Sequence, residues 1–314
     1  MDPLNPNTTG VFSHSEFLLL GFPGLSKTRQ FLVLPFLTIY LVILAGNSLV
    51  ISRIWAEKSL HSPMYVLIAL LFAVNISSTS AILPKFLLGL AFHWNQVTLS
   101  GCLVQMFSIY FFAIFESGII LFMALDRYVA ICRPLHYHDI MTMDFLGRLI
   151  FIGMTRSSVM VIPLVVLAST VHFCGSNIIL NFACENMGLI NLACSDTSLS
   201  QIVGMAVRVI VTVGDAVLLV MSYAKILHAA MKIAVGKARH KALQTCSNHL
   251  SVAMMIYVCA MSASIVMDIS VDVQNLTSAI YYLFPALIHP VIYGLRVKEI
   301  KVCILKAWKT TRSM

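Results

Sequence analysis

Charged residues are scarce in this sequence. Asp, Glu, Lys and Arg make up 11% of the 314 residues, whereas 59% of the residues are hydrophobic. Soluble globular domains contain about 25% charged residues, so this composition argues against a single water-soluble fold. The sequence also lacks solenoid-type repeats and low-complexity tracts. We therefore expect one membrane domain.

Motifs of two other classes of membrane protein are absent as well. An intramembrane enzyme would need His-Glu-x-x-His or paired aspartates within its helices, but Glu116 and Asp215 are single carboxylates without a partner at motif spacing. A secondary transporter would show inverted repeats and broken helices, and the sequence shows neither. The sequence thus indicates no enzyme, no catalytic residues and no metal site, and a transporter is a remote alternative.

Long apolar segments dominate what is present. Seven windows of about 20 residues are apolar enough to cross a hydrocarbon core about 30 Å thick, and such segments satisfy their backbone in lipid as helices. We predict an all-α membrane protein, a seven-transmembrane helix bundle, with helices at 31–54, 63–90, 99–132, 146–169, 199–227, 241–264 and 272–295. This domain, 31–295, follows an extracellular tail at 1–30 and precedes a cytoplasmic segment at 296–314.

The placement of lysine and arginine predicts the orientation. Sixteen of them lie on one side of the predicted helices, and only Lys27, Arg29 and Lys85 lie on the other. Positive residues gather in cytoplasmic loops, so we expect a multi-pass plasma-membrane protein with its N-terminus outside and its C-terminus inside. The first helix, rather than a cleavable signal peptide, is expected to direct insertion.

The net charge of +8 then belongs to the cytosolic face. It suits anionic membrane lipids and gives no reason to expect a nucleic-acid partner. In residues 296–314, apolar residues recur every three or four positions between lysines. This spacing predicts a short amphipathic helix lying in the membrane interface.

Four cysteines fall on the predicted outer side: Cys102, Cys174, Cys184 and Cys194. Four cysteines allow three pairings, and sequence spacing does not choose between them. Three of them lie in the loop at residues 170–198, which is long for a connector and which we interpret as a lid over a ligand chamber. On the outer tail, Asn7 begins an Asn-Thr-Thr triplet that predicts N-glycosylation.

Polar side chains interrupt several apolar windows. Asn47 should face the inside of the bundle and find a partner in Asn75 on the next helix. Charged residues inside a membrane are rare, and we expect Glu116, Arg156 and Asp215 to be paired or internally hydrated. Arg208 either contacts the ligand or has a structural role, such as reaching the outer interface.

Short motifs along the chain follow one known pattern. The runs from Met123 to Cys132 and from Lys241 to Leu250 carry the most specific ones. Further matches are Pro63-Met64-Tyr65, Ser222-Tyr223 and Pro290-Val291-Ile292-Tyr293-Gly294. Over nearly its whole length the chain resembles odorant (olfactory) receptors, which are rhodopsin-like G-protein-coupled receptors. Its similarity to the class I, fish-like branch rests on Gln105-Met106-Phe107, Glu116-Ser117-Gly118, Arg156 and Asp215.

The resemblance implies a function. An odorant receptor binds a small volatile molecule in the extracellular half of the bundle and activates a heterotrimeric G protein, here of the stimulatory olfactory type that raises cyclic AMP. A non-olfactory chemoreceptor of the same family, for a small metabolite, is the alternative. The resemblance also implies the disulfide pairs Cys102–Cys184 and Cys174–Cys194.

The family pattern also implies roles for single residues. The ligand-binding positions that carry over are Met106, Ile109, Tyr110, Ala113, Met187, Arg208, Tyr257, Met261, Ser264 and Tyr282. The positions for G-protein coupling and activation are Asp126, Arg127, Tyr128, Tyr223 and Tyr293. At rest Asp126 would hold Arg127, and an outward movement of the sixth helix would free Arg127 to contact the G protein.

The chain departs from this pattern at Asn75, where the family usually has aspartate, and at His289, where it usually has asparagine. No cofactor is implied, apart from a weak internal sodium site near Glu116, which Asn75 weakens further. Arg208 would anchor an acidic odorant, whereas Asp268 near the outer end of the sixth helix would repel one. The ligand class therefore stays open.

Overall fold

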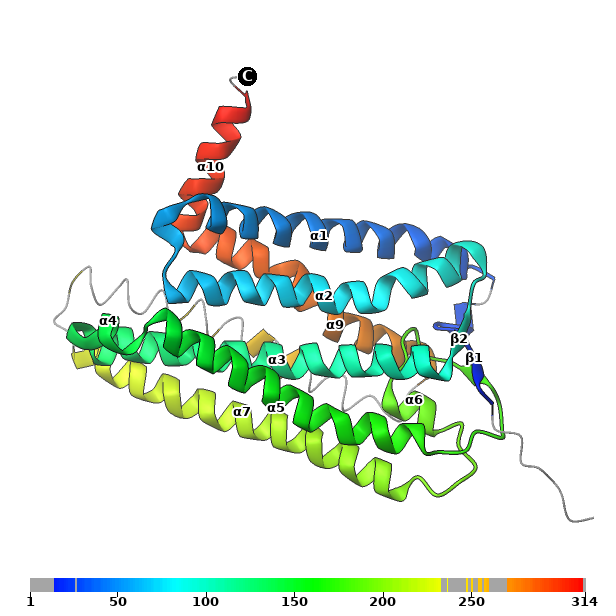
Figure 1. Cartoon of the computed structure of the whole chain (residues 1–314). Coiled ribbons are helices and arrows are strands. Elements are labelled where there is room, and N and C mark those ends of the chain that lie inside the picture. Colours follow the sequence, from blue (N-terminus) through cyan, green and yellow to red (C-terminus); the bar gives the residue numbers. More distant parts are fainter. Residues whose placement is uncertain are drawn as a thin grey trace, which may run out of the picture.

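The computed structural model describes residues 14–25, 27–232 and 270–312, together with residues 236, 247, 250, 254–255 and 257–259. Long helices running side by side fill this part of the chain (Figure 1). They are α1 (Val33–Ala56), α2 (Pro63–Phe92), α3 (Leu99–Cys132), α5 (Met143–Ser169), α7 (Ser198–Lys232) and α9 (Val271–Arg296). The predicted helix at 241–264 lies mostly outside the described residues.

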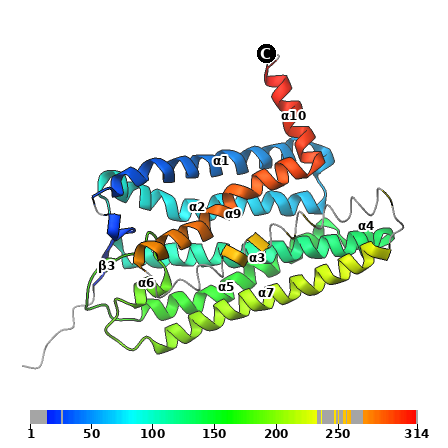
Figure 2. The same cartoon turned by 180° about the vertical axis from the view of Figure 1, so that it is seen from behind.

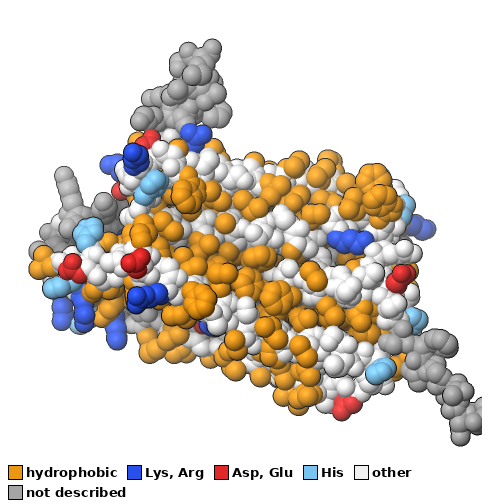
Figure 3. Space-filling view, in the orientation of Figure 1, with side chains coloured by type: hydrophobic (Ala, Val, Ile, Leu, Met, Phe, Trp, Pro, Cys, Tyr) orange, Lys and Arg blue, Asp and Glu red, His pale blue; other side chains and the backbone are white. Residues whose placement is uncertain are grey.

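Six helices in the described part of the chain are long and apolar enough to cross a membrane. Large apolar side chains stay exposed on their outer faces, among them Phe151, Val159 and Val220. Contiguous exposed apolar surface of this kind marks a face that meets lipid rather than water. Figure 3 shows hydrophobic side chains across the middle of the molecule and Lys and Arg gathered mainly at one end. The predicted helical membrane bundle is confirmed.

Capping residues explain where several helices begin and end. The Oγ1 atom of Thr98 accepts a hydrogen bond from the backbone N–H of Gly101 at 3.1 Å and so starts α3. Thr142 caps α5 in the same way. Pro63 stands at the first position of α2, where its fixed φ suits the helix, and His93 ends that helix with φ at 60°.

Helix α3 is the centre of the bundle. It packs against α2, α5 and α7, and α9 packs against α1 and α2 (Figures 1 and 2). The inner half of the core includes the fully buried side chains of Leu67, Phe72, Met123 and Tyr293. Because α3 reaches from one end of the bundle to the other, its two ends face opposite sides of the membrane.

A small sheet caps the end of the bundle away from α10 (Lys298–Arg312) (Figure 1). Its strands are β1 (Glu16–Leu19), β2 (Gln96–Thr98) and β3 (Ile178–Ile179), in the order β2-β1-β3. β1 is antiparallel to β2 and parallel to β3. The sequence predicts no strand here and a tail in place of β1, because segments of two to four residues show no usable periodicity.

Short helices complete the connections. They are η1 (Pro23–Leu25), η2 (Arg29–Leu32), η3 (Lys58–Leu60), η4 (Pro134–His136), α4 (Tyr137–Ile140) and α6 (Asn186–Ile190). Helix α10 follows α9 directly and leads away from the bundle at the end where α4 lies (Figure 1). Its residue Ile300 is fully buried against the inner core, which attaches the start of α10 to the bundle.

Candidate functional site

The loop between α5 and α7 is tied down by two disulfides. Cys102 at the outer end of α3 pairs with Cys184, with their Cα atoms 5.3 Å apart. Cys174 pairs with Cys194 within the loop, with their Cα atoms 5.8 Å apart. These are the two pairs that the resemblance implied.

Three hydrogen bonds from alternate backbone N–H groups seat this loop on the helices. Phe182 N–H donates to Oδ1 of Asn275 on α9 at 2.7 Å. Cys184 N–H donates to Oε1 of Gln105 at 2.9 Å, and Asn186 N–H donates to the Tyr110 hydroxyl at 3.0 Å, both on α3. Residues 182–186 of the loop, including Glu185, therefore have defined positions over the helix bundle.

Beneath the loop lies a cavity of about 280 Å³. Residues of α3, α5, α6, α7 and α9 line it, together with Tyr257. Six of the predicted ligand-binding residues are among them: Tyr110, Ala113, Met187, Arg208, Tyr257 and Tyr282. Small-molecule sites are concave, mostly apolar and furnished with a few polar groups, and this cavity has those features.

Two predicted ligand residues do not line this cavity. Met106 is fully buried against the outer cluster around Cys102 and Cys184, and Ile109 is buried against α2. The cavity face of α3 instead carries residues 110, 113, 114 and 117, spaced by three or four positions along the helix. Met261, Ser264 and Asn7 lie outside the described residues.

Glu185 also lines the cavity, although the sequence did not predict it as a ligand-binding residue. Its carboxylate accepts hydrogen bonds from the hydroxyls of Ser278 and Tyr282 on α9 and interacts electrostatically with Arg208 on α7. Burial raises the pKa of the Glu185 carboxyl, whereas Arg208 and the two hydroxyls act in the opposite direction. A glutamate in a long loop carries no local signal of such a position, although it directly follows the disulfide-bonded Cys184.

A charged pair lies next to the inner side of the cavity. Arg156 on α5 donates from Nη2 to both carboxylate oxygens of Asp215 on α7, at 2.7 and 2.8 Å. The hydroxyl of Ser117 on α3 donates to the same carboxylate at 2.6 Å and lies 3.3 Å from the Tyr257 hydroxyl. The sequence left pairing and internal hydration open for Arg156 and Asp215; the structure pairs them with each other, and through Ser117 the pair meets the cavity wall.

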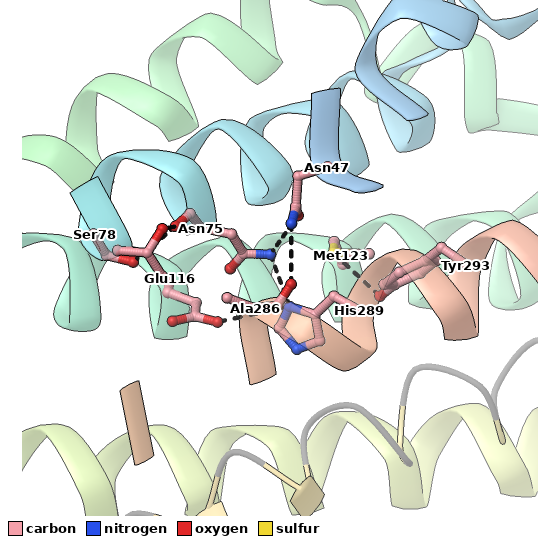
Figure 4. A network of polar contacts seen from close by, with 9 residues as sticks. Asn47, Asn75, Ser78, Glu116, Met123, Ala286, His289 and Tyr293 are labelled. Carbon is pink, nitrogen blue, oxygen red and sulfur yellow. Dashed lines mark hydrogen bonds and ion pairs between the residues drawn. The ribbon is translucent and has the colours of Figure 1, made fainter. Parts of the chain in front are cut away.

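A second polar network joins α1, α2, α3 and α9 (Figure 4). Nδ2 of Asn75 donates to Oδ1 of Asn47 at 3.0 Å and lies 3.2 Å from Nδ1 of His289. Asn47 in turn donates to the backbone oxygen of Ala286 at 3.0 Å. The predicted contact between Asn47 and Asn75 is therefore confirmed.

Glu116 faces this network, with its Oε1 atom 3.8 Å from Nδ1 of His289. A sodium ion would need a cage of oxygen atoms, as hard cations do. Here Asn75 replaces a carboxylate, its Nδ2 atom is directed at Asn47 and His289, and an imidazole stands beside Glu116 (Figure 4). These side chains do not fit a sodium ion.

At the other end of α3, Asp126 and Arg127 form an ion pair. Nε of Arg127 donates to Oδ2 of Asp126 at 3.0 Å, and Asp126 is fully buried. The hydroxyl of Tyr137 on α4 donates to Oδ1 of Asp126 at 2.7 Å. Tyr137 was not predicted, because it lies eleven residues further along, beyond the end of α3, at no spacing that a single helix would bring together.

The other predicted coupling residues lie around this pair. Tyr293 is fully buried on α9, and its hydroxyl is 3.9 Å from the sulfur of Met123 on α3. Tyr223 on α7 is buried in the same cluster, and Tyr128 packs against it. The residues predicted for coupling are thus gathered at the inner end of the bundle.

Comparison with known proteins agrees with this architecture. The family model described as "Olfactory receptor" matches residues 36–310. Olfactory receptor 52K2 of Homo sapiens is 36% identical over 295 residues, which cover 93% of this chain and 94% of that protein. Olfactory receptor 56B34 of Mus musculus is 36% identical over 297 residues, covering 94% and 92%.

A third relative, olfactory receptor 51E2 of Mus musculus, is 33% identical over 302 residues, covering 95% of this chain and 94% of that protein. Both the similarity and the helix bundle extend over nearly the whole chain. The chain belongs to the olfactory receptor family, whose members are seven-transmembrane G-protein-coupled receptors and not enzymes.

Proposed function

We propose that this receptor detects a small volatile molecule in the cavity under the disulfide-bonded loop. In response it activates a heterotrimeric G protein of the stimulatory olfactory type, which raises cyclic AMP. One observation carries the proposal: α3 forms a wall of the cavity and also bears the Asp126–Arg127 pair at the opposite end of the bundle. From Tyr110 to Arg127 a helix rises about 26 Å at about 1.5 Å per residue.

The cavity suits a small ligand that binds mainly through apolar contact. Enclosed apolar surface contributes about 25 cal/mol per Å², and few polar groups are needed to orient a small molecule. Tyr110, Tyr257 and Tyr282 supply hydroxyls next to the apolar side chains of Ala113 and Met187. Ligand contact with Tyr257 would act on Ser117 and so on the Arg156–Asp215 pair.

The Asp126–Arg127 pair, at the end of the bundle opposite the cavity, acts as the activation switch. Arg127 keeps its positive charge at any physiological pH, and in this structure Asp126 neutralises it. Once the bundle opens, the guanidinium is free to bind the carbonyl groups of a G protein. Tyr223 and Tyr293, buried close by, are placed to pack in the opened arrangement.

This function needs a defined orientation in the plasma membrane. The proposal places the N-terminus and the disulfide-bonded loop outside, and α4, α10 and the C-terminus inside. The distribution of Lys and Arg supports it, since these residues gather near the end with α4 (Figure 3). The lysines of α10 are then next to anionic lipid headgroups of the inner leaflet.

The test is a screen of an odorant panel in cells that carry a cyclic AMP reporter. We expect at least one odorant to raise cyclic AMP through the wild-type receptor. The Arg127→Ala variant should lose this response while its delivery to the cell surface persists. A full response from Arg127→Ala would contradict the role proposed for that residue, and a delivered receptor that answers no odorant would contradict the function.

A further inference from the structure

We propose that Glu185 and Arg208 together set the ligand class of the cavity, so that it takes a neutral molecule bearing a hydroxyl group and discriminates against carboxylates. This inference rests on the proposed function, since it concerns the ligand of the same cavity. It assigns to Glu185 a role in specificity that is separate from signalling.

In the part of the chain that the structure describes, the cavity lining carries one acidic and one basic side chain. Glu185 and Arg208 are the only charged side chains among the described residues that line it. They interact electrostatically across the site. The nearby Arg156 and Asp215 are bonded to each other and so add no net charge. The described part of the cavity lining is therefore balanced between one acidic and one basic side chain.

Glu185 is held in this place by its neighbours. The backbone N–H groups of Cys184 and Asn186, on either side of it, are hydrogen-bonded to α3. Its carboxylate is hydrogen-bonded by Ser278 and Tyr282 on α9. Since both the backbone and the side chain are anchored, Glu185 cannot simply turn away when a negatively charged ligand approaches Arg208.

The chemistry of the pair decides between ligand classes. A ligand carboxylate would be attracted by Arg208 and repelled by Glu185, and a ligand ammonium would experience the reverse. A hydroxyl group is both a donor and an acceptor, so it can donate to the Glu185 carboxylate and accept from the Arg208 guanidinium. Like charges placed together in a desolvated site are costly, whereas a neutral hydroxyl leaves the charges of the site balanced.

The volume limits the size of the ligand. A cavity of about 280 Å³ lies close to the lower end of the range for small-molecule sites, about 300–1,000 Å³, so a small ligand is favoured. The apolar side chains of Ile114, Leu164, Val207 and Val211 are available to a short alkyl chain. A straight-chain primary alcohol meets both the volume and the polarity of the site.

Three probes with nine non-hydrogen atoms each test this inference: 1-octanol, heptanoic acid and octan-1-amine, with homologues one and two carbons shorter. Each is applied to cells with the full-length receptor and a cyclic AMP reporter. We expect the wild-type receptor to respond to the alcohols at a half-maximal concentration at least about tenfold below that of the acids, which corresponds to about 1.4 kcal/mol.

Variants of Glu185 and Arg208 test whether these two residues cause the preference for alcohols over acids. Glu185→Gln keeps the shape and hydrogen bonding of the side chain, and it should lower the half-maximal concentration of the acids at least about tenfold relative to the alcohols. The double variant Glu185→Gln with Arg208→Gln should lose this gain. Asp196→Asn is the matched control, because it removes an exposed carboxylate from the same loop outside the cavity. It should leave the acid-to-alcohol ratio unchanged.

Should Glu185→Gln fail to reach the cell surface, Arg208→Gln tests the same pair from the other side and should favour the amines. A wild-type receptor that prefers acids, or that ignores all three series, overturns the ligand class. An unchanged acid-to-alcohol ratio in delivered Glu185→Gln overturns it too. The proposed function survives these results if any odorant of the broad panel still raises cyclic AMP.

Discussion

Arg156 on α5 and Asp215 on α7 form an ion pair between two helices inside the bundle. Asp215 is nearly inaccessible, whereas the Arg156 side chain retains 27% of its exposure. Breaking a buried pair leaves one charge uncompensated, which costs more than the pair contributes. The pair therefore matters for correct packing of α5 on α7 even if its net stabilisation is small.

We expect Asp215→Asn to destabilise the receptor by about 3 kcal/mol, because Arg156 would keep its charge without a counterion. The midpoint of thermal unfolding in detergent measures the loss. Replacing both residues, as Asp215→Leu with Arg156→Met, should restore much of the stability. If the double variant were as unstable as the single one, the Ser117 contact rather than the ion pair would be decisive.

The hydrogen bond from Tyr137 to Asp126 should affect the basal activity of the receptor. A hydrogen bond to a charged group contributes about 1.5–3 kcal/mol, and this one stabilises the arrangement in which Asp126 holds Arg127. Tyr137→Phe should therefore raise basal cyclic AMP in the absence of odorant. Tyr40→Phe, which removes a hydroxyl bonded to Ser80, is the control. Unchanged or lower basal cyclic AMP in Tyr137→Phe would argue against this resting contact.

At the scale of whole elements, the loop over the cavity depends on its covalent links. The disulfide Cys102–Cys184 joins residues 82 positions apart, and Cys174–Cys194 joins residues 20 apart. In the loop-entropy description these links contribute about 4.5 and about 3.3 kcal/mol. Only the longer link fixes the loop to α3 and holds Glu185 at the cavity.

Cys102→Ser should accordingly prevent delivery of the receptor to the cell surface, whereas Cys174→Ser should reduce delivery only in part. Flow cytometry of unpermeabilised cells with an epitope at the N-terminus measures both. Cys303→Ser provides a control, since that cysteine is not disulfide-bonded. Equal losses for Cys102→Ser and Cys174→Ser would mean that the position of the loop depends on both links alike.

Helices could be predicted from the sequence where a local run of apolar residues marked them. The helices predicted at 63–90 and 99–132 begin in the structure at those same residues, Pro63 and Leu99. The sheet escaped prediction because its strands come from the N-terminal segment, the α2–α3 connection and the long loop. Hydrogen bonding between such distant segments produces no pattern in the sequence of any one segment.

The whole molecule has an apolar girdle between two polar ends (Figure 3). One end carries the sheet and both disulfides, and the other carries α4 and α10 (Figure 1). Disulfides persist in oxidising compartments, and Lys and Arg are enriched on the cytoplasmic side of membrane proteins. Both asymmetries favour the orientation proposed above.

An epitope placed next to Asn7 should therefore be stained on intact cells, and an epitope after Met314 only once the cells are permeabilised. Staining of the C-terminal epitope on intact cells would contradict the orientation. The receptor without any epitope, detected by its cyclic AMP response, controls for effects of the added segments.

The sequence by itself determined the class of the molecule. Hydropathy over a bilayer-sized window is a one-dimensional property, so the membrane helices could be found without knowing how they pack. The motifs around Arg127 likewise identified the family before any contact was known. The pairing of Asn47 with Asn75 could be predicted because polar groups in lipid must find partners, whereas for Arg156 and Asp215 only pairing or hydration in general was expected.

Only the tertiary structure decided which side chains share the cavity. Which side chains reach the cavity depends on the rotation of each helix about its axis. The rotation of α3 directs Tyr110 toward the cavity and buries Met106 and Ile109 elsewhere. The tertiary structure also brought Glu185 from the loop beside Arg208 and placed Tyr137 on Asp126. Such contacts join residues far apart in the chain, so the packing of the bundle, and not any local pattern, determines them.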